Sequence, residues 1–108
     1  MDLSIIILNY RSKGLLKNCL RGILKHPPEI SYEIIVVDNF SGDGCPQMMK
    51  ENFSDIKCVA SPVNVGHPAG NNLGIQEASG RYIMLLNPDT VIFNDALDKL
   101  VKFMDEHP

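Results

Sequence analysis

This sequence of 108 residues lacks the patterns that identify several common classes of protein. It contains no run of basic residues and its formal net charge is −3, which argues against a nucleic-acid binder held by phosphate contacts. Its three cysteines form no Cys-x-x-Cys pair, so neither a disulfide framework nor a structural zinc site is indicated. The apolar run at residues 3–8 is far shorter than the roughly 20 residues that a membrane-spanning helix needs. We therefore expect no nucleic-acid partner and no transmembrane segment in this chain.

Two nucleotide-binding motifs and a signal peptide are also missing. There is no Gly-x-Gly-x-x-Gly after residues 3–8 and no Gly-x-x-x-x-Gly-Lys-Ser/Thr in the chain. A bound nucleotide would have to be held in another way, by backbone amides and a metal ion. Asp2, rather than a basic segment, precedes the first apolar run, so a signal peptide is not indicated. We expect a cytoplasmic protein, with the inner face of the membrane as a second candidate location.

The apolar residues that are present follow two periodicities in alternation. Apolar runs predict buried strands at residues 3–8, 33–38 and 82–86, and a short strand is expected at residues 56–60. Helical spacing predicts four helices, which begin at Lys13, near Pro46, within residues 61–74, and at Asn94 or Asp95. Strands that alternate with helices predict an α/β fold with a mostly parallel sheet flanked by helices.

Three of the predicted helices carry an apolar face that should pack on the sheet. In the first, which Ser12 can cap, this face comprises Leu15, Leu16, Cys19, Leu20, Ile23 and Leu24. In the second it comprises Met48, Met49 and Phe53. In the last it comprises Ala96, Leu97, Leu100, Val101 and Met104. The remaining helix, the third, should end near Ser79 and Gly80, because glycine is favoured just past a helix end.

The apolar run at residues 82–86 stops abruptly at the polar turn Asn87, Pro88, Asp89 and Thr90. Pro88 has no N–H and disfavours the α region for Asn87, so the strand must end there in an extended turn. We expect this strand to be central and buried on both faces, with Asn87 and Asp89 at its carboxyl end. A carboxylate at such a position suits a divalent cation that also holds a phosphate. The alternative is an ordinary turn that caps the following helix.

Polar residues follow the other three predicted strands as well. Parallel strands end at one edge of a sheet, and in open α/β sheets ligands bind at this edge. The residues expected there are Asn9, Tyr10, Asp38, Asn64, Gly66, Asn87 and Asp89. Each of them also has a simpler explanation as a turn former, but four groups at one edge favour a binding site.

Asp38 and the segment before the fourth strand carry more specific expectations. Asp38 follows four apolar residues, so it either caps a loop or accepts a hydrogen bond from a ligand N–H. Asn71 and Asn72 could bind a ligand or simply begin a helix. Three glycines recur at helical spacing, and close packing on the sheet and contact with a ligand explain them equally well. These glycines are Gly66, Gly70 and Gly74.

Four of these segments match a known family in order and spacing. They are residues 4–10 (Ser-Ile-Ile-Ile-Leu-Asn-Tyr), 33–44 (Asp-Asn, then Ser-Gly-Asp-Gly), 64–75, and 82–90 (ending in Asn-Pro-Asp-Thr). The chain resembles the amino-terminal half of glycosyltransferase family 2, the inverting nucleotide-sugar transferases of GT-A fold. It is most similar to the rhamnosyltransferase-like branch, whose metal motif reads Asn-x-Asp rather than Asp-x-Asp. The resemblance implies that residues 1–108 are the Rossmann-like, nucleotide-sugar-binding part of a larger catalytic domain.

The resemblance also implies roles for the matching positions. Asn9 and Tyr10 would border the base, and Asp38 would accept the N3–H of uracil or thymine. The segment 64–72 would pass beside the nucleotide, with Asn72 near the ribose and diphosphate. Asp89 would bind Mg²⁺ or Mn²⁺, and Asn87 would lie beside the metal, the ribose or the sugar. The implied donor is a UDP- or dTDP-sugar, and the implied acceptor is a glycan or a lipid-linked molecule in cell-surface polysaccharide synthesis.

Three departures from the family pattern affect this site. His67 and Pro68 stand where related sequences commonly have Phe and a small residue, which would alter the loop over the donor. Asn87 replaces the first acid of Asp-x-Asp, which lowers the negative charge available to a metal. Phe40 separates Asn39 from Ser41, at a position where a polar residue is common in the family.

Two other functions stay open at this point. The general base that inversion requires lies beyond this segment in the family, so the chain could be a catalytically incomplete nucleotide-binding or scaffolding module. A nucleotidyltransferase would need a glycine-rich basic loop after the first strand, which residues 9–14 suggest only faintly. The apolar surface that a half-domain exposes could also make the protein a homo-oligomer.

Overall fold

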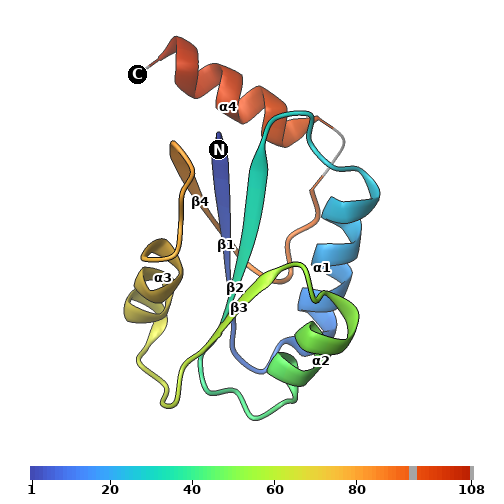
Figure 1. Ribbon diagram of the computed structural model, residues 1–108, viewed down its shortest axis with the longest axis vertical. Helices are drawn as coiled ribbons and strands as arrows, with labels where there is room; N and C mark the ends of the chain where they lie inside the picture. The colour runs from blue at the N-terminus through green and yellow to red at the C-terminus, as the bar shows by residue number, and fades with distance from the viewer. Residues whose placement is uncertain (93–94, 108) are drawn as a thin grey trace.

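The computed structural model describes residues 1–92 and 95–107, and Figure 1 shows its ribbon. Strands and helices alternate in the predicted order, which confirms the α/β class. The elements are β1 (Leu3–Asn9), α1 (Lys13–Lys25), β2 (Tyr32–Asp38), α2 (Cys45–Asn52), β3 (Lys57–Ala60), α3 (His67–Ile75), β4 (Tyr82–Leu86) and α4 (Ala96–Glu106). Asp95 occupies the N-cap position of α4, whereas Asn94, the other expected cap, lies outside the described residues.

All four strands are parallel and lie in the order β3-β2-β1-β4. In Figure 1, α1 and α2 lie on one side of the sheet and α3 on the other, while α4 crosses its amino-terminal end. Asn9 at the end of β1 is opposite Asp38 at the end of β2, and Ile7 is opposite Leu86 of β4. The carboxyl ends of β1, β2 and β4 therefore meet at one edge, as predicted.

The centre of the structure is β1, all seven residues of which are buried. Because side chains alternate along a strand, β1 contributes to two cores. Ile5 and Ile7 join the larger core beneath α1 and α2, and Ile6 and Leu8 join the smaller core beneath α3. Full burial of each such side chain stabilises the fold by about 1.5–3 kcal/mol, so β1 is the main apolar anchor of both layers.

The strand that we expected to be central lies at an edge of this sheet. Within the described residues β4 pairs with β1 alone, and Ile83 and Leu85 are 44% and 52% exposed. They point to the face that α3 covers, but α3 packs over β1 and β2 and does not shield them. The prediction that residues 82–86 are central and buried on both faces was therefore wrong.

Two of the predicted apolar helix faces are broader than the faces that the structure buries. In α1, Leu15 and Leu24 are exposed, and in α4, Leu100 and Met104 are exposed. The other members of both faces are buried or partly buried, and α2 buries all three residues predicted for it. A helix on a small sheet buries only the stripe that directly faces the strands, so side chains at the margins of an apolar face remain in solvent.

The third helix ends earlier than predicted, at Ile75 rather than near Ser79 and Gly80. After Ile75 the chain tightens into a turn in which the Glu77 and Ala78 N–H groups donate to the carbonyls of Gly74 and Ile75, and the next two N–H groups bond to the sheet. The Ser79 N–H donates to Glu33 Oε2 at 2.7 Å, and the Gly80 N–H donates to Ser4 Oγ at 2.8 Å. A Cβ on Gly80 would lie 2.5 Å from the Ser4 nitrogen, so glycine is required here for close approach to β1.

Polar contacts attach α4 to the amino-terminal end of the sheet. Asp98 accepts the N–H groups of Glu29 and Ile30 at 2.9 and 3.0 Å, and Asp105 forms an ion pair with Arg81 at 3.0 Å. None of the helices in residues 1–92 and 95–107 has the length and apolar character needed to cross a membrane.

Candidate functional site

A buried hydrogen-bonded cluster joins the carboxyl ends of β1 and β2. The Asn9 amide donates to Asp38 Oδ1 at 2.9 Å, and the Ser41 hydroxyl donates to the same oxygen. The Asn9 carbonyl oxygen accepts the Ser12 N–H at 3.2 Å. Asn9 is completely buried, so its side chain orients Asp38 rather than facing solvent.

Asp38 combines deep burial with one open oxygen. The residue is only 4% exposed, and both of its side-chain hydrogen bonds within the described structure reach Oδ1. In the described part of the chain no buried side-chain oxygen lacks a partner, so Oδ2, which accepts neither bond, keeps access to solvent. This oxygen is an acceptor held in a fixed position and available to an incoming N–H.

Asp43 was not among the predicted site residues, yet it fixes the loop that follows β2. Its carboxylate accepts the N–H of Lys13 at 3.1 Å and of Cys45 at 3.0 Å, the first residues of α1 and α2. One side chain thereby caps two helices, whereas the Ser12 hydroxyl, the predicted cap, makes no cap hydrogen bond. Burial alone would raise the pKa of Asp43, but hydrogen bonds from a hydroxyl, an amide and these N–H groups outweigh it and hold the pKa below its ordinary value.

A second cluster fastens the loop after β3 to the loop after β2. The Asn39 amide donates to Asn64 Oδ1 at 3.1 Å and to the Gly66 carbonyl at 3.3 Å, and its own oxygen accepts the Val65 N–H at 3.0 Å. Asn64 and Gly66, both predicted site residues, are therefore brought beside Asp38 by the residue that follows it. The sequence does not single out Asn39, because its partner Asn64 lies 25 residues away in the chain.

The glycines of α3 are explained by packing on the sheet. A Cβ on Gly74 would lie 2.5 Å from Ile6 Cγ2, and one on Gly70 would lie 2.8 Å from Leu8 Cδ1. Both positions need glycine whether or not a ligand binds, which decides between the two explanations that the sequence left open. Gly66 has open space around it but a φ of +84°, a backbone conformation that favours glycine.

The two asparagines of α3 differ in accessibility. Asn71 is largely buried, and its amide lies 3.3 Å from His67 Nδ1 one helical turn earlier. Asn72 is exposed. Of the two predicted site residues, Asn72 is thus the one that presents its side chain to solvent.

The polar turn after β4 forms as predicted. The Thr90 N–H donates to the Asn87 carbonyl at 3.0 Å and closes a turn around Pro88. Asn87 and Asp89 are exposed, and Asp89 lines a cavity of about 170 Å³ together with Cys19 of α1. Burial, and secondly the nearby Asp89 charge, raise the pKa of the Cys19 thiol. The Asp89 carboxylate therefore lies on the α1 side of the sheet.

Asp38 and Asp89 follow strands on either side of β1 and belong to the same side of the sheet. Asp38 is two residues beyond Val36, which faces the core beneath α1 and α2. Their strands, β2 and β4, both pair with β1, so one strand lies between the two segments that carry these carboxylates. Tyr10, at the end of the strand between them, is exposed, and the Arg11 guanidinium lies 5.1 Å from the centre of its ring.

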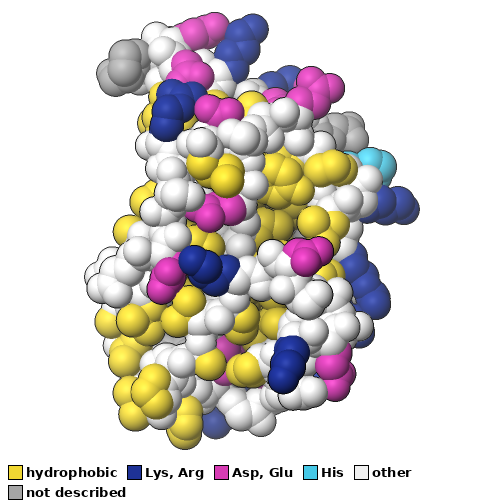
Figure 2. Space-filling view, in the orientation of Figure 1, with side chains coloured by type: hydrophobic (Ala, Val, Ile, Leu, Met, Phe, Trp, Pro, Cys, Tyr) yellow, Lys and Arg dark blue, Asp and Glu magenta, His cyan; other side chains and the backbone are white. Residues whose placement is uncertain are grey.

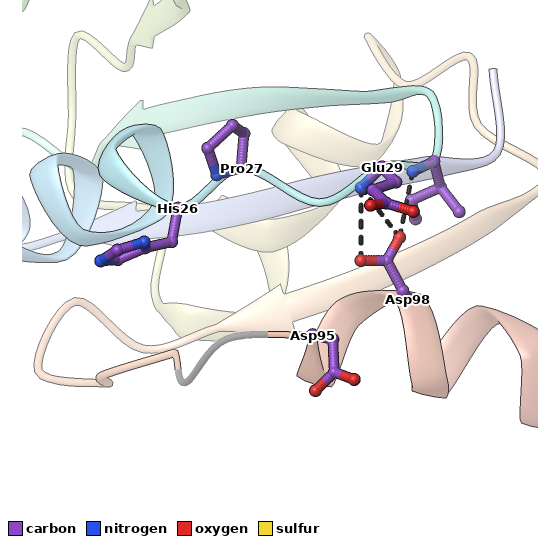
Figure 3. A pocket seen from close by; sticks show the side chains of 6 residues that line it. His26, Pro27, Glu29, Asp95 and Asp98 are labelled. Atoms are coloured by element: carbon purple, nitrogen blue, oxygen red, sulfur yellow. Dashed lines mark hydrogen bonds between the residues drawn. The ribbon is translucent and has the colours of Figure 1, made fainter.

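Two larger hollows lie toward the amino-terminal end of the sheet, away from this edge. One is a cavity of about 570 Å³ lined by residues that include His26, Glu29, Asp95 and Asp98. Figure 3 shows that both Asp98 oxygens there accept backbone N–H groups. A second groove, of about 410 Å³, is apolar and lies between β4 and α4. Neither contains a residue predicted for the site.

The model of Glycosyl transferase family 2 matches residues 4–108. The chain belongs to glycosyl transferase family 2. Its relatives include the "Poly(ribitol-phosphate) beta-glucosyltransferase" of Bacillus spizizenii, 32% identical over 99% of this chain and 18% of the relative. The "Low-salt glycan biosynthesis hexosyltransferase Agl10" of Haloferax volcanii is 35% identical over 92% of this chain and 31% of the relative.

The structure of TarS 1-349 from Staphylococcus aureus in complex with UDP superimposes with a TM-score of 0.84 at 26% identity. The match covers 99% of this chain and 33% of that chain. This likeness confirms the predicted Rossmann-like part of a GT-A fold. The chain spans between about a fifth and a third of the length of these family members.

Proposed function

We propose that this chain supplies the donor site of an inverting glycosyltransferase, which moves a sugar from a nucleoside diphosphate to an acceptor hydroxyl. The observation that carries the proposal is Asp38, a buried carboxylate fixed through Oδ1 and open at Oδ2, at the ligand edge of a family-2 chain. Residues 1–108 are then the amino-terminal, donor-binding part of a larger catalytic domain.

The donor is a UDP- or dTDP-sugar, because uracil and thymine both present an N3–H that Asp38 Oδ2 can accept. Asn9 orients Asp38 through the hydrogen bond to Oδ1, and Tyr10 borders the base. The loop that carries Asn64 and Gly66 bounds the other side of the nucleotide, with Asn71 behind it and the exposed Asn72 near the ribose. The UDP complex of TarS supports a uridine donor.

The residues after β4 fit a divalent cation, Mg²⁺ or Mn²⁺. Among residues 1–92 and 95–107 no group of three or more His, Cys, Asp or Glu side chains could hold an ion without other ligands. A single exposed carboxylate is enough for an ion that takes its remaining ligands from a diphosphate and water, as Mg²⁺ commonly does. Asp89 would hold the ion and Asn87 would lie beside it; when bound, the ion would stabilise the charge on the departing diphosphate.

The acceptor is a glycan or a lipid-linked molecule in cell-surface polysaccharide synthesis, a proposal supported by the relatives that act on poly(ribitol-phosphate) and in glycan biosynthesis. The reaction takes place in the cytoplasm at the inner face of the membrane, and the general base is supplied from outside residues 1–108. The exposed Ile83 and Leu85 of β4 could take part in association with a second copy.

Calorimetric titration of the protein with UDP and dTDP, with and without Mn²⁺, tests the donor site. We expect Mn²⁺ to tighten UDP binding by roughly tenfold or more, and Asp89→Ala to abolish that gain, since removal of a charged ligand typically changes binding by more than 1.4 kcal/mol. Asp55→Ala, which removes an exposed aspartate outside the site, is the matched control. The metal site would be refuted if Mn²⁺ left the affinity for UDP unchanged, or if Mn²⁺ still tightened UDP binding to Asp89→Ala.

A further inference from the structure

The loops after β1 and β2 bend through a strained residue at equivalent positions. Asn9 and Asp38 are register partners, and two residues beyond each lie Arg11 and Phe40, both with a φ of +56°. Within the described residues these are the two non-glycine residues with positive φ. A bulky side chain disfavours this left-handed conformation, which glycine or asparagine would adopt far more readily.

Phe40 cannot relax out of this conformation because both of its neighbours are fixed. Asn39 is tied to the loop after β3, and Ser41 is tied to Asp38 and to Asp43 Oδ1 at 2.8 Å. Asn39 and Ser41 are 3% and 6% exposed, whereas Phe40 is 61% exposed. The loop therefore holds a large aromatic ring in solvent, and the packing of the protein does not account for it.

The surroundings of Phe40 match the chemistry of a nucleobase. Asp38, two residues away, offers an open acceptor oxygen for the edge of a base, while Tyr10 is exposed at the end of the neighbouring strand. Val63 and Val65, in the loop that Asn39 holds, are exposed as well. In Figure 2 hydrophobic side chains gather at the lower left, over α3 and the loop that leads into it. A base has a hydrogen-bonding edge and an apolar face, and aromatic side chains commonly stack on that face.

We propose that Phe40 contacts the face of the donor's base, while Asp38 accepts its N3–H. The inference deepens the proposed function and rests on it, since it assigns a base-contacting residue within the same donor site. The strained conformation is retained because it aims the ring at the base. Backbone strain at an exposed, otherwise unexplained residue is characteristic of functional positions.

Phe40→Gly separates the binding role of the ring from any role in folding. Glycine relieves the backbone strain, so we expect Tm to stay the same or to rise by up to about 5 °C. The Kd for UDP in the presence of Mg²⁺ should rise about tenfold, the effect expected from loss of one stacking contact. The Kd for inorganic pyrophosphate, which has no base, should not change. Phe40→Tyr should restore UDP binding.

A second variant reports the contact directly. The chain contains no tryptophan, so Phe40→Trp introduces a single fluorophore at the proposed contact. UDP should quench its fluorescence with the midpoint that calorimetry gives. Phe103→Trp places the fluorophore on α4, at a side chain that is also exposed, and its fluorescence should not respond.

The outcomes separate this inference from the proposed function. A wild-type protein that binds no UDP overturns both. If the wild type binds UDP, two results together would refute the contact of Phe40 with the base but not the donor site. These are an unchanged UDP affinity of Phe40→Gly and a Phe40→Trp fluorescence that does not respond to UDP. The contact is also refuted if Phe40→Gly weakens pyrophosphate binding as much as UDP binding, because the ring would then act through the shape of the loop rather than through the base.

Discussion

At the scale of single residues, the ends of the strands hold polar side chains in a fixed network. The sequence identified Asn9 and Asp38 because both follow continuous apolar runs. It did not identify Asp43 or Asn39, whose importance comes from partners that folding brings together. The positive φ of Phe40 could not be predicted from the sequence either, because phenylalanine rarely adopts this conformation. Functional positions that contradict a local preference are the ones that sequence reasoning is expected to miss.

Asp43 provides a test at this scale. Replacement by alanine removes the cap of both α1 and α2, and we expect a loss of about 1–3 kcal/mol in the free energy of unfolding at pH 7. The pKa of Asp43 in the folded protein is held below its ordinary value, so its contribution is present above a pH of about 4 and is lost as the pH falls through the folded-state pKa. Chemical denaturation of both proteins between pH 7 and pH 2.5 should show the difference shrink. A difference that persists or grows in acid would contradict this assignment.

At the scale of elements, the order of strands and helices was predictable from periodicity, but the exposure of β4 was not. A continuous apolar run has the same pattern whether or not a neighbouring strand or helix covers it. Within residues 1–92 and 95–107 no strand or helix covers Ile83 and Leu85. The end of α3 was misplaced for a similar reason, because distant acceptors on Ser4 and Glu33 capture the N–H groups that follow it. The glycines of α3 were located correctly, and only the structure could show that Gly70 and Gly74 touch the sheet.

A glycine-to-alanine substitution, which adds one methyl group, tests how closely α3 packs against the sheet. Gly74→Ala places a Cβ 2.5 Å from Ile6 Cγ2, so we expect a loss of about 1–3 kcal/mol in the free energy of unfolding. The matched control is Gly14→Ala in α1, where a Cβ would meet nothing within 4 Å. That variant should be neutral or more stable by about 0.5–1 kcal/mol, because alanine favours the helix. Equal effects of the two substitutions in urea denaturation would rule out close packing as the reason for Gly74.

At the scale of the whole molecule, the two ends of the sheet have different characters. The carboxyl end carries fixed polar groups, exposed aromatic rings and a free carboxylate at Asp89, whereas the amino-terminal end and β4 carry polar anchors for α4 and an apolar groove. Strand order places Asp38 and Asp89 after the two strands that flank β1, and both belong to the same side of the sheet. The central claim is that these two carboxylates bind opposite ends of one nucleoside diphosphate.

A crystal structure of the protein grown with UDP and Mn²⁺ tests this claim most directly. We predict an anomalous manganese peak at Asp89 and a uracil N3 within hydrogen-bonding distance, about 2.9 Å, of Asp38 Oδ2. A nucleotide bound elsewhere, or a manganese ion at the acidic cavity formed by Asp95 and Asp98 with Asp89 left empty, would contradict it.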